Sequence, residues 1–193
     1  MMRAVNEHHR TNAELQAGLS ATQISPRNEG RLELIVRRPN VGGREILAEG
    51  ELDVVSGLVG DTWPQRPSSR TPDRSPHPDL QLTLMNSRVA TLIAGDVTRW
   101  PLAGDQLYVD FDISETNLPP GTRLEIGASV IEITAQPHTG CGKFVQRFGV
   151  AAMKFVNSPR GRELHLRGIN ARVVRPGMIR TGDAVRKIAA HAD

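Results

Sequence analysis

Apolar and polar residues alternate over several short stretches of this chain, which is the pattern of β-strands that bury one face. The alternating stretches are residues 31–38, 45–55, 80–86, 104–113 and 122–136. The last of them is interrupted at Gly127-Ala128, so it predicts a β-hairpin. Residues 168–188 predict two further strands, with turns at Pro176-Gly177 and at Thr181-Gly182-Asp183. The chain is therefore predicted to be rich in short strands.

One stretch has the period of a helix instead. Its apolar residues between 144 and 155 recur at the spacing of one helical face, so we expect an amphipathic helix that begins near Cys141. Gly149 is expected to weaken the middle of this helix. Capping signals predict two shorter helices, one from residues 86–87 through Ala94 and one after residues 11–14.

The elements divide the chain into an N-terminal extension and one domain. Residues 1–30 are mostly polar and are interpreted as an extension, whereas residues 31–190 form a single predicted domain. Within it, residues 62–79 hold five prolines and no periodic apolar face, which excludes a helix or an interior strand. This segment is predicted to be a long loop, rich in Pro and Arg, of the kind that is often functional.

Composition supports a mainly β, α+β fold. The chain has 193 residues, of which 38% are hydrophobic and only 4% aromatic, with 13 Pro and 18 Gly. The core must therefore rest on Val, Ile, Leu and Ala from many short elements joined by turns.

The charge balance suits an anionic ligand but does not identify it. The net charge is +3 and the isoelectric point is about 9.6, values compatible with phosphate or a nucleic-acid surface. Nucleic acid is disfavoured because the Trp, Tyr and Phe residues do not interleave with basic ones as a stacking platform would. The sequence also has no P-loop, no G-x-G-x-x-G and no G-x-S-x-G nucleophile elbow.

A single cysteine cannot form an internal disulfide, so an oxidising compartment is not required. The first residues lack the apolar core of a signal peptide, and no stretch is long and apolar enough for a membrane helix. We therefore expect a cytoplasmic protein with no membrane association. Zinc is not expected, since no C-x-x-C or H-x-x-x-H spacing occurs.

Cys141 is the main candidate for chemistry. It lies between Gly140 and Gly142 at the predicted start of a helix, where unpaired N–H groups and the helix dipole favour a thiolate. His138, three residues earlier, is a second catalytic candidate, either as a proton donor or as a charge that lowers the thiol pKa. The alternatives are a small buried cysteine and a histidine that only stabilises a turn.

The order of these segments resembles the MOSC domain, a family named after the C-terminal domain of molybdenum-cofactor sulfurases. The resemblance covers roughly residues 45–188, and its most specific parts are PHTGCGKF around Cys141 and the pattern R-V-x-x-P-G-x-x-x-x-G-D-x-V in residues 172–185. It implies a β-barrel-like sheet with a few flanking helices. It also implies that Cys141 carries sulfur as a persulfide or coordinates the molybdenum of a pterin cofactor.

Other residues follow from the same resemblance and from charge. Asn117 is similar to a family asparagine that follows an acidic residue, although here Glu115 stands one place further away. Lys143 and Arg147, near Cys141, and Arg172 are candidates to hold the anionic pterin phosphate, because guanidinium groups bind phosphate with two parallel hydrogen bonds. A solvated basic surface is the alternative for each. The family's pyridoxal-phosphate module has no counterpart in this chain.

Three functions remain open from the sequence. The first is a protein that binds molybdenum cofactor or carries sulfur on Cys141, with a sulfur donor as its partner. The second is a small molybdenum-dependent reductase of N-hydroxylated compounds that receives electrons from a partner protein. The third is a non-catalytic binding domain in which Cys141 is buried.

Overall fold

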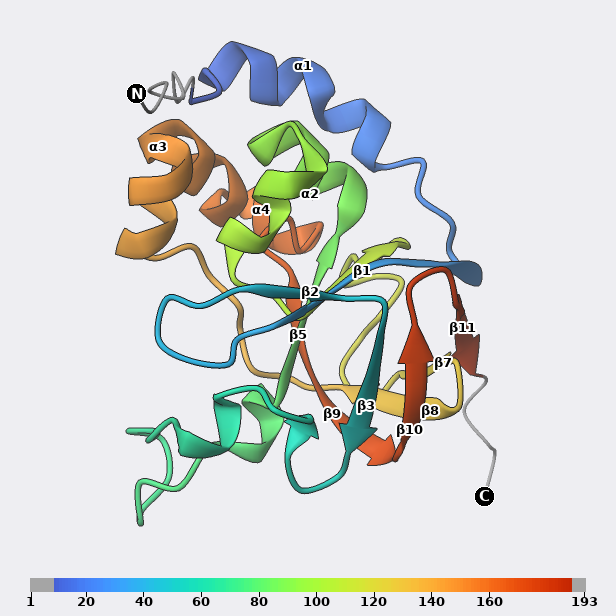
Figure 1. Cartoon of the computed structure of the whole chain (residues 1–193). Helices are drawn as coiled ribbons and strands as arrows, with labels where there is room; N and C mark the ends of the chain where they lie inside the picture. The colour runs from blue at the N-terminus through green and yellow to red at the C-terminus, as the bar shows by residue number, and fades with distance from the viewer. Residues whose placement is uncertain (1–8, 189–193) are drawn as a thin grey trace, which may run out of the picture.

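The computed structural model describes residues 9–188, and these form a β-barrel with helices over one end (Figure 1). Residues 1–8 of the predicted extension and residues 189–190 of the predicted domain lie outside this range. The helices are α1 (Asn12–Thr22), α2 (Ser87–Ala94), α3 (Gly142–Asn157) and α4 (Pro159–Glu163), with 3-10 turns η1 (Trp63–Gln65), η2 (Pro78–Leu80) and η3 (Val97–Ala103). The strands are β1 (Glu29–Arg37), β2 (Glu45–Leu47), β3 (Glu49–Asp53), β4 (Gly57–Leu58), β5 (Leu82–Asn86), β6 (Leu107–Asp110), β7 (Arg123–Ile126), β8 (Ser129–Ile133), β9 (Ile169–Arg175), β10 (Gly177–Arg180) and β11 (Ala184–Ile188).

The main sheet closes on itself, as expected for a barrel. Its strand order is β11-β7-β8-β9-β5-β6-β1-β2, and an additional pairing of β11 with β1 joins seven of these strands into a ring. The closing pair is antiparallel, with Glu29 opposite Arg186 and Arg31 opposite Ala184. Closure leaves no free sheet edge in the ring, and so removes the unpaired backbone groups of an open sheet.

Two apolar clusters form the core. The first fills the barrel and includes Leu32, Leu107 and Ile131, all fully buried. The second lies between the barrel and the helices, where Phe148 of α3 and Leu15 of α1 pack with their neighbours. The face of α3 that is buried here is the one that the apolar period of residues 144–155 predicted. Gly149 interrupts the helix with a non-helical φ of 85°.

The predicted local signals around the helices are confirmed. The side chain of Asn86 accepts hydrogen bonds from the N–H groups of Arg88 and Val89 and so caps α2. Thr11 and Glu14 form both halves of a capping box at the start of α1. Helix α1 lies across α2 and α3 at the top of Figure 1.

The prediction of two strands in residues 168–188 was wrong, because the segment forms three. Gly177–Arg180 is strand β10, which pairs with β3 and, through β3, with β4 in a small separate sheet. Pro176-Gly177 was interpreted as a turn between two strands, but β10 begins at Gly177 itself and finds its partner far away in the sequence. The predicted long loop at residues 62–79 contains only the short η1 and part of η2.

Candidate functional site

A cleft of about 910 Å³ opens beside the start of α3. Its walls come from the loop after β1, from the Pro- and Arg-rich segment after β4, and from the segment that joins β8 to α3. The cations that line it are Arg38, Arg44, Arg66, Arg70, Lys143, Arg147 and Arg167, while no Asp or Glu of residues 9–188 lines it. The cleft is therefore strongly electropositive and suits an anionic ligand.

Cys141 lies on the wall of this cleft. It is the residue before the first turn of α3, its backbone is extended (φ −124°, ψ −179°), and its side chain is exposed. Partial burial would raise the pKa of its thiol. The N–H groups of Phe144 and Lys143 and the charges of Arg167 and Lys143 outweigh that effect and lower the pKa. The thiol is thus accessible and biased toward the thiolate.

His138 lies on the same wall but cannot supply a positive charge at neutral pH. Its side chain is only 17% exposed, and burial together with the nearby charge of Arg167 lowers its pKa to about 3. Its Nδ1 lies 3.5 Å from Oδ1 of Asp105, and neither atom has a hydrogen-bond partner within the usual geometry. The charge that favours the thiolate therefore comes from Arg167 and Lys143, and not from His138 as one sequence hypothesis had it.

Four arginines are held by four consecutive backbone carbonyls at the end of η3. These bonds join Arg44 Nε to Pro101 O (3.0 Å), Arg147 Nη1 to Leu102 O (2.6 Å), Arg167 Nη2 to Ala103 O (2.8 Å) and Arg38 Nη1 to Gly104 O (3.0 Å). Gly104 adopts a left-handed conformation (φ 96°) as it ends η3, which glycine does without strain. One short segment thus gathers guanidinium groups from distant parts of the chain.

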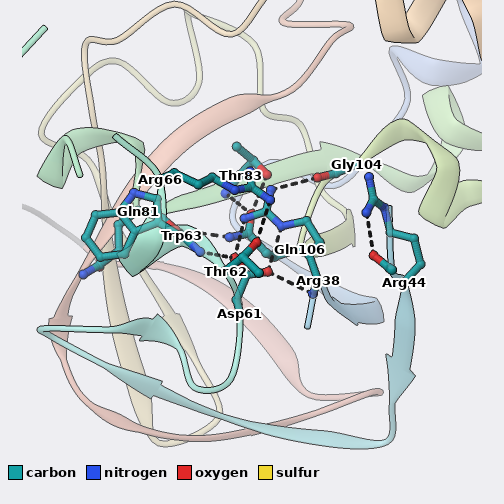
Figure 2. A network of polar contacts seen from close by, with 11 residues as sticks. Arg38, Arg44, Asp61, Thr62, Trp63, Arg66, Gln81, Thr83, Gly104 and Gln106 are labelled. Carbon is teal, nitrogen blue, oxygen red and sulfur yellow. Dashed lines mark hydrogen bonds and ion pairs between the residues drawn. The ribbon is translucent and has the colours of Figure 1, made fainter. Parts of the chain in front are cut away.

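Two of the four arginines also have a carboxylate. Arg38 makes a two-pronged ion pair with Asp61, 2.7 Å at Nε and 2.7 Å at Nη2, and both side chains are almost fully buried. Figure 2 shows the Arg38 guanidinium between Asp61 and Gly104. Arg167 binds Asp105 at 2.7 Å and stacks on the ring of Phe144, whose centroid is 5.0 Å away. We call the buried Arg38 and Arg167 the floor cations.

Arg44 and Arg147 have carbonyl partners but no carboxylate among residues 9–188. Burial, and then the charge of Arg147, lowers the pKa of Arg44. We call Arg44, Arg147 and Lys143, which are more exposed than the floor cations, the mouth cations. Their charge is not neutralised within the described chain, so an anion in the cleft would be stabilised by them.

The proline-rich segment adds a further cation to this wall. The guanidinium of Arg66 donates a hydrogen bond to the hydroxyl of Thr62 at 2.9 Å, beside Arg38 (Figure 2). Burial and the charge of Arg38 lower the pKa of Arg66. The loop that the sequence identified by its prolines is therefore part of the cleft.

The structure brings four of the six predicted site residues together. Cys141, His138, Lys143 and Arg147 all line the cleft. Asn117 and Arg172 do not. The Asn117 amide is buried and donates to the carbonyls of Arg27 and Asp112.

Arg172 projects from β9 and pairs with Glu132 at 2.7 Å and with Asp79 at 3.4 Å. It is thus neutralised outside the cleft, so a role in holding the phosphate there is not supported by its position.

The sequence did not single out Arg38 or Arg44. Arg38 is the last residue of a predicted strand and Arg44 follows a Gly-Gly pair, so neither stands in a recognisable motif. Within the described range there is also no group of three or more His, Cys, Asp or Glu side chains placed to hold a metal ion. No helix of residues 9–188 is long and apolar enough to cross a membrane.

The model of the MOSC domain family matches residues 78–186, more than half of the chain. No curated protein sequence matches this chain. Similar solved structures include the YuaD protein of Bacillus subtilis, with a TM-score of 0.62 and 18% identity over 84% of this chain and 97% of that one. YiiM of Escherichia coli has a TM-score of 0.54 and 20% identity over 84% and 72% of the two chains. At these identities the structures support the fold alone.

Proposed function

Since this chain belongs to the MOSC domain family, which is associated with the molybdenum cofactor, we propose that it binds an anionic form of that cofactor in the cleft beside Cys141. The observation that carries the proposal is the combination of a reachable, acidified thiol with cations that no carboxylate in the described chain neutralises. A soft thiolate suits molybdenum, and guanidinium groups suit a phosphate.

The chemistry of the side chains fits such a ligand. Cys141 would contact the metal, while Arg44, Arg147 and Lys143 would hold the phosphate and the other anionic groups. Arg167 carries an Nε that is buried without a hydrogen-bond partner, a donor still available at the cleft wall. Bound there, the cofactor would supply a redox-active metal centre. The protein's own contribution is to orient it and to neutralise its charge.

The exposed thiol with a lowered pKa also favours a second function, the transport of sulfur. In this reaction the Cys141 thiolate attacks the outer sulfur of a donor persulfide. A new S–S bond forms on Cys141, the donor S–S bond breaks, and its electron pair leaves with the donor thiolate. The donor would be a separate sulfur-transfer protein, and a lone reactive thiol suits the reducing cytoplasm. Reduction of N-hydroxylated compounds stays a prediction, because it needs an electron-transfer partner.

One experiment separates these functions. The protein is produced in a host that makes the cofactor, and its molybdenum content and the mass of its Cys141 peptide are measured. We expect stoichiometric molybdenum in the wild type and its loss in Cys141→Ser, with little change in thermal unfolding. The exposed Arg175, which pairs with Glu125 outside the cleft, gives the control Arg175→Gln, whose loading should be unchanged.

A peptide that carries one added sulfur atom, in protein free of molybdenum, would favour sulfur transport. A wild type that holds neither metal nor added sulfur, and whose thiol resists alkylation near neutral pH, would contradict both functions. It would leave the non-catalytic binding domain. Unfolding of Cys141→Ser would instead indicate a structural role for this side chain.

A further inference from the structure

A second pocket, of about 450 Å³, lies behind the wall that carries His138. It shares Pro137, His138, Thr139 and Arg167 with the cleft, so only this wall separates the two. Its other sides are the connection between β6 and β7, helix α4 and the start of β9. Its volume is in the range typical of small-molecule sites.

The interior of this pocket is apolar. Leu118, Ile133, Val156 and Ile169 line it, and each is almost fully buried. Arg167, the buried charged residue of the lining, is already paired with Asp105, so filling this part leaves no new unpaired charge there. An aliphatic or aromatic group would therefore bind there by removing apolar surface from water.

Two opposite charges lie in the lining of the same pocket. Glu115 and Arg162 are both exposed, and neither side chain makes an ion pair or hydrogen bond to any described residue. Their backbones are near one another, because Glu115 N–H donates to the carbonyl of Glu163, the residue after Arg162, at 2.9 Å. By contrast Arg160, also on α4, is already engaged with Glu163 and Gln23.

His165 supplies a further acceptor. Its Nδ1 lies 2.7 Å from the carbonyl oxygen of Ile113, and since a carbonyl only accepts, Nδ1 must carry the hydrogen. In the neutral ring Nε2 is then an acceptor. The backbone of His165 is left-handed (φ 49°), which is uncommon for a residue with a side chain and often marks a functional position.

We propose that this pocket binds a free α-amino acid with an apolar side chain. The carboxylate pairs with Arg162, the ammonium group donates to Glu115 and to Nε2 of His165, and the side chain lies among Leu118 and its apolar neighbours. A peptide would not satisfy both charges, because it carries its terminal ammonium and carboxylate on different residues. The proposal is independent of what the cleft binds.

Titration calorimetry with L-leucine tests this. Isopentylamine lacks the carboxylate, 4-methylpentanoate lacks the ammonium group, and glycine lacks the apolar side chain, so we expect each to bind at least about tenfold more weakly than leucine. Arg162→Gln and Glu115→Gln should weaken leucine by a similar factor, and Ala135→Phe should block the pocket from its exposed side. Arg160→Gln is the matched control on the same helix and should leave the affinity unchanged.

Cys141→Ser should bind leucine as the wild type does, which separates this proposal from the function of the cleft. The proposal is overturned if the wild type does not bind leucine, or if the amine or the acid alone binds as tightly. Equal affinities of wild type and Arg162→Gln would overturn it too. Folding of each variant is checked by its thermal unfolding, and Glu115→Gln provides a second test should Arg162→Gln fail to fold.

Discussion

The arginines among the floor cations and the mouth cations are anchored in the same way but differ in charge compensation. Arg38 and Arg167 each bind a carbonyl of the η3 end and also a buried carboxylate. Arg44 and Arg147 bind carbonyls of the same segment and have no carboxylate among the described residues. Backbone carbonyls orient a guanidinium without neutralising it, so the same segment can support both a structural and a ligand-binding arginine.

The largest expected effect is a loss of stability when a floor cation loses its carboxylate partner. In Asp61→Asn the Arg38 guanidinium stays buried without its counter-charge, and we expect the free energy of unfolding to fall by about 3–5 kcal/mol. Asp61 also accepts from the backbone N–H groups of Arg38 and Trp63, so its loss loosens two further contacts. Urea denaturation measures the change.

Arg44→Gln is the matched control for this change, because Arg44 has no carboxylate to leave behind. Its free energy of unfolding should differ from the wild type by less than about 1 kcal/mol. Equal destabilisation by the two variants would show that charge compensation does not distinguish floor from mouth.

The next effect concerns affinity and not stability. Arg147→Gln and Arg44→Gln each remove a charged hydrogen-bond donor worth about 1.5–3 kcal/mol, so phosphate should bind to either variant roughly 10 to 150 times more weakly. Calorimetric titration with inorganic phosphate gives the constants. Arg175→Gln, which alters an exposed arginine outside the cleft, should bind as the wild type does. Unchanged affinity in both mouth variants would place the anion elsewhere.

Much of the fold was predictable because its signals are local. Strand β1 and the hairpin of β7 and β8 follow from the alternation of apolar residues, and the Asn86 cap follows from its position before a helical stretch. Strand β10 was not predictable in this way. Its partner, β3, lies more than a hundred residues earlier, and the alternation within β10 is too short to indicate it.

The site residues also divide into those with a local sequence signal and those that only long-range contacts bring to the site. Cys141 is recognisable from the glycines beside it and from the helix that follows, both of which are local features. Arg38 and Arg44 are held at the cleft by the carbonyls of Gly104 and Pro101, and Arg38 also by Asp61. These are contacts between distant segments, which leave no sequence pattern. Asn117 shows the converse: its family motif is local, but its amide is used to hold two backbone carbonyls.

A third prediction concerns the pH dependence of stability that comes from His138, which lies beside the floor cation Arg167. His138, beside Asp105 and Arg167, has a pKa of about 3 in the folded protein against an ordinary 6.5, so the folded state holds the ring neutral. The contribution of the neutral ring to the free energy of unfolding is fully present above pH 6.5. It is lost as the pH falls toward 3, because the His138 ring takes up a proton in the unfolded chain before it does so in the folded protein. Between pH 6 and 5 the loss approaches about 1.4 kcal/mol per pH unit for one such group.

His138→Asn cannot titrate and should lack this slope. Urea unfolding of the wild type and the variant at pH 7, 6 and 5 measures it, since the other histidines contribute equally to both proteins. Parallel stability curves would mean that the His138 ring is protonated as readily in the folded protein as in the unfolded chain. The surroundings of His138 would then be more hydrated than the burial of its ring indicates.

The smallest effect concerns the mouth and the thiol. The charges of Arg167 and Lys143 both lower the pKa of Cys141, but Arg167 is already paired with Asp105 whereas Lys143 has no carboxylate in the described chain. In Lys143→Met the pKa of the thiol should therefore rise, and the pH profile of iodoacetamide alkylation should move to higher pH. Lys154→Met, in the last turn of the same helix, is the control and should leave the profile in place. If both variants kept the wild-type profile, the N–H groups of the first turn together with Arg167 would be sufficient to lower the pKa of Cys141, and Lys143 would act on the ligand alone.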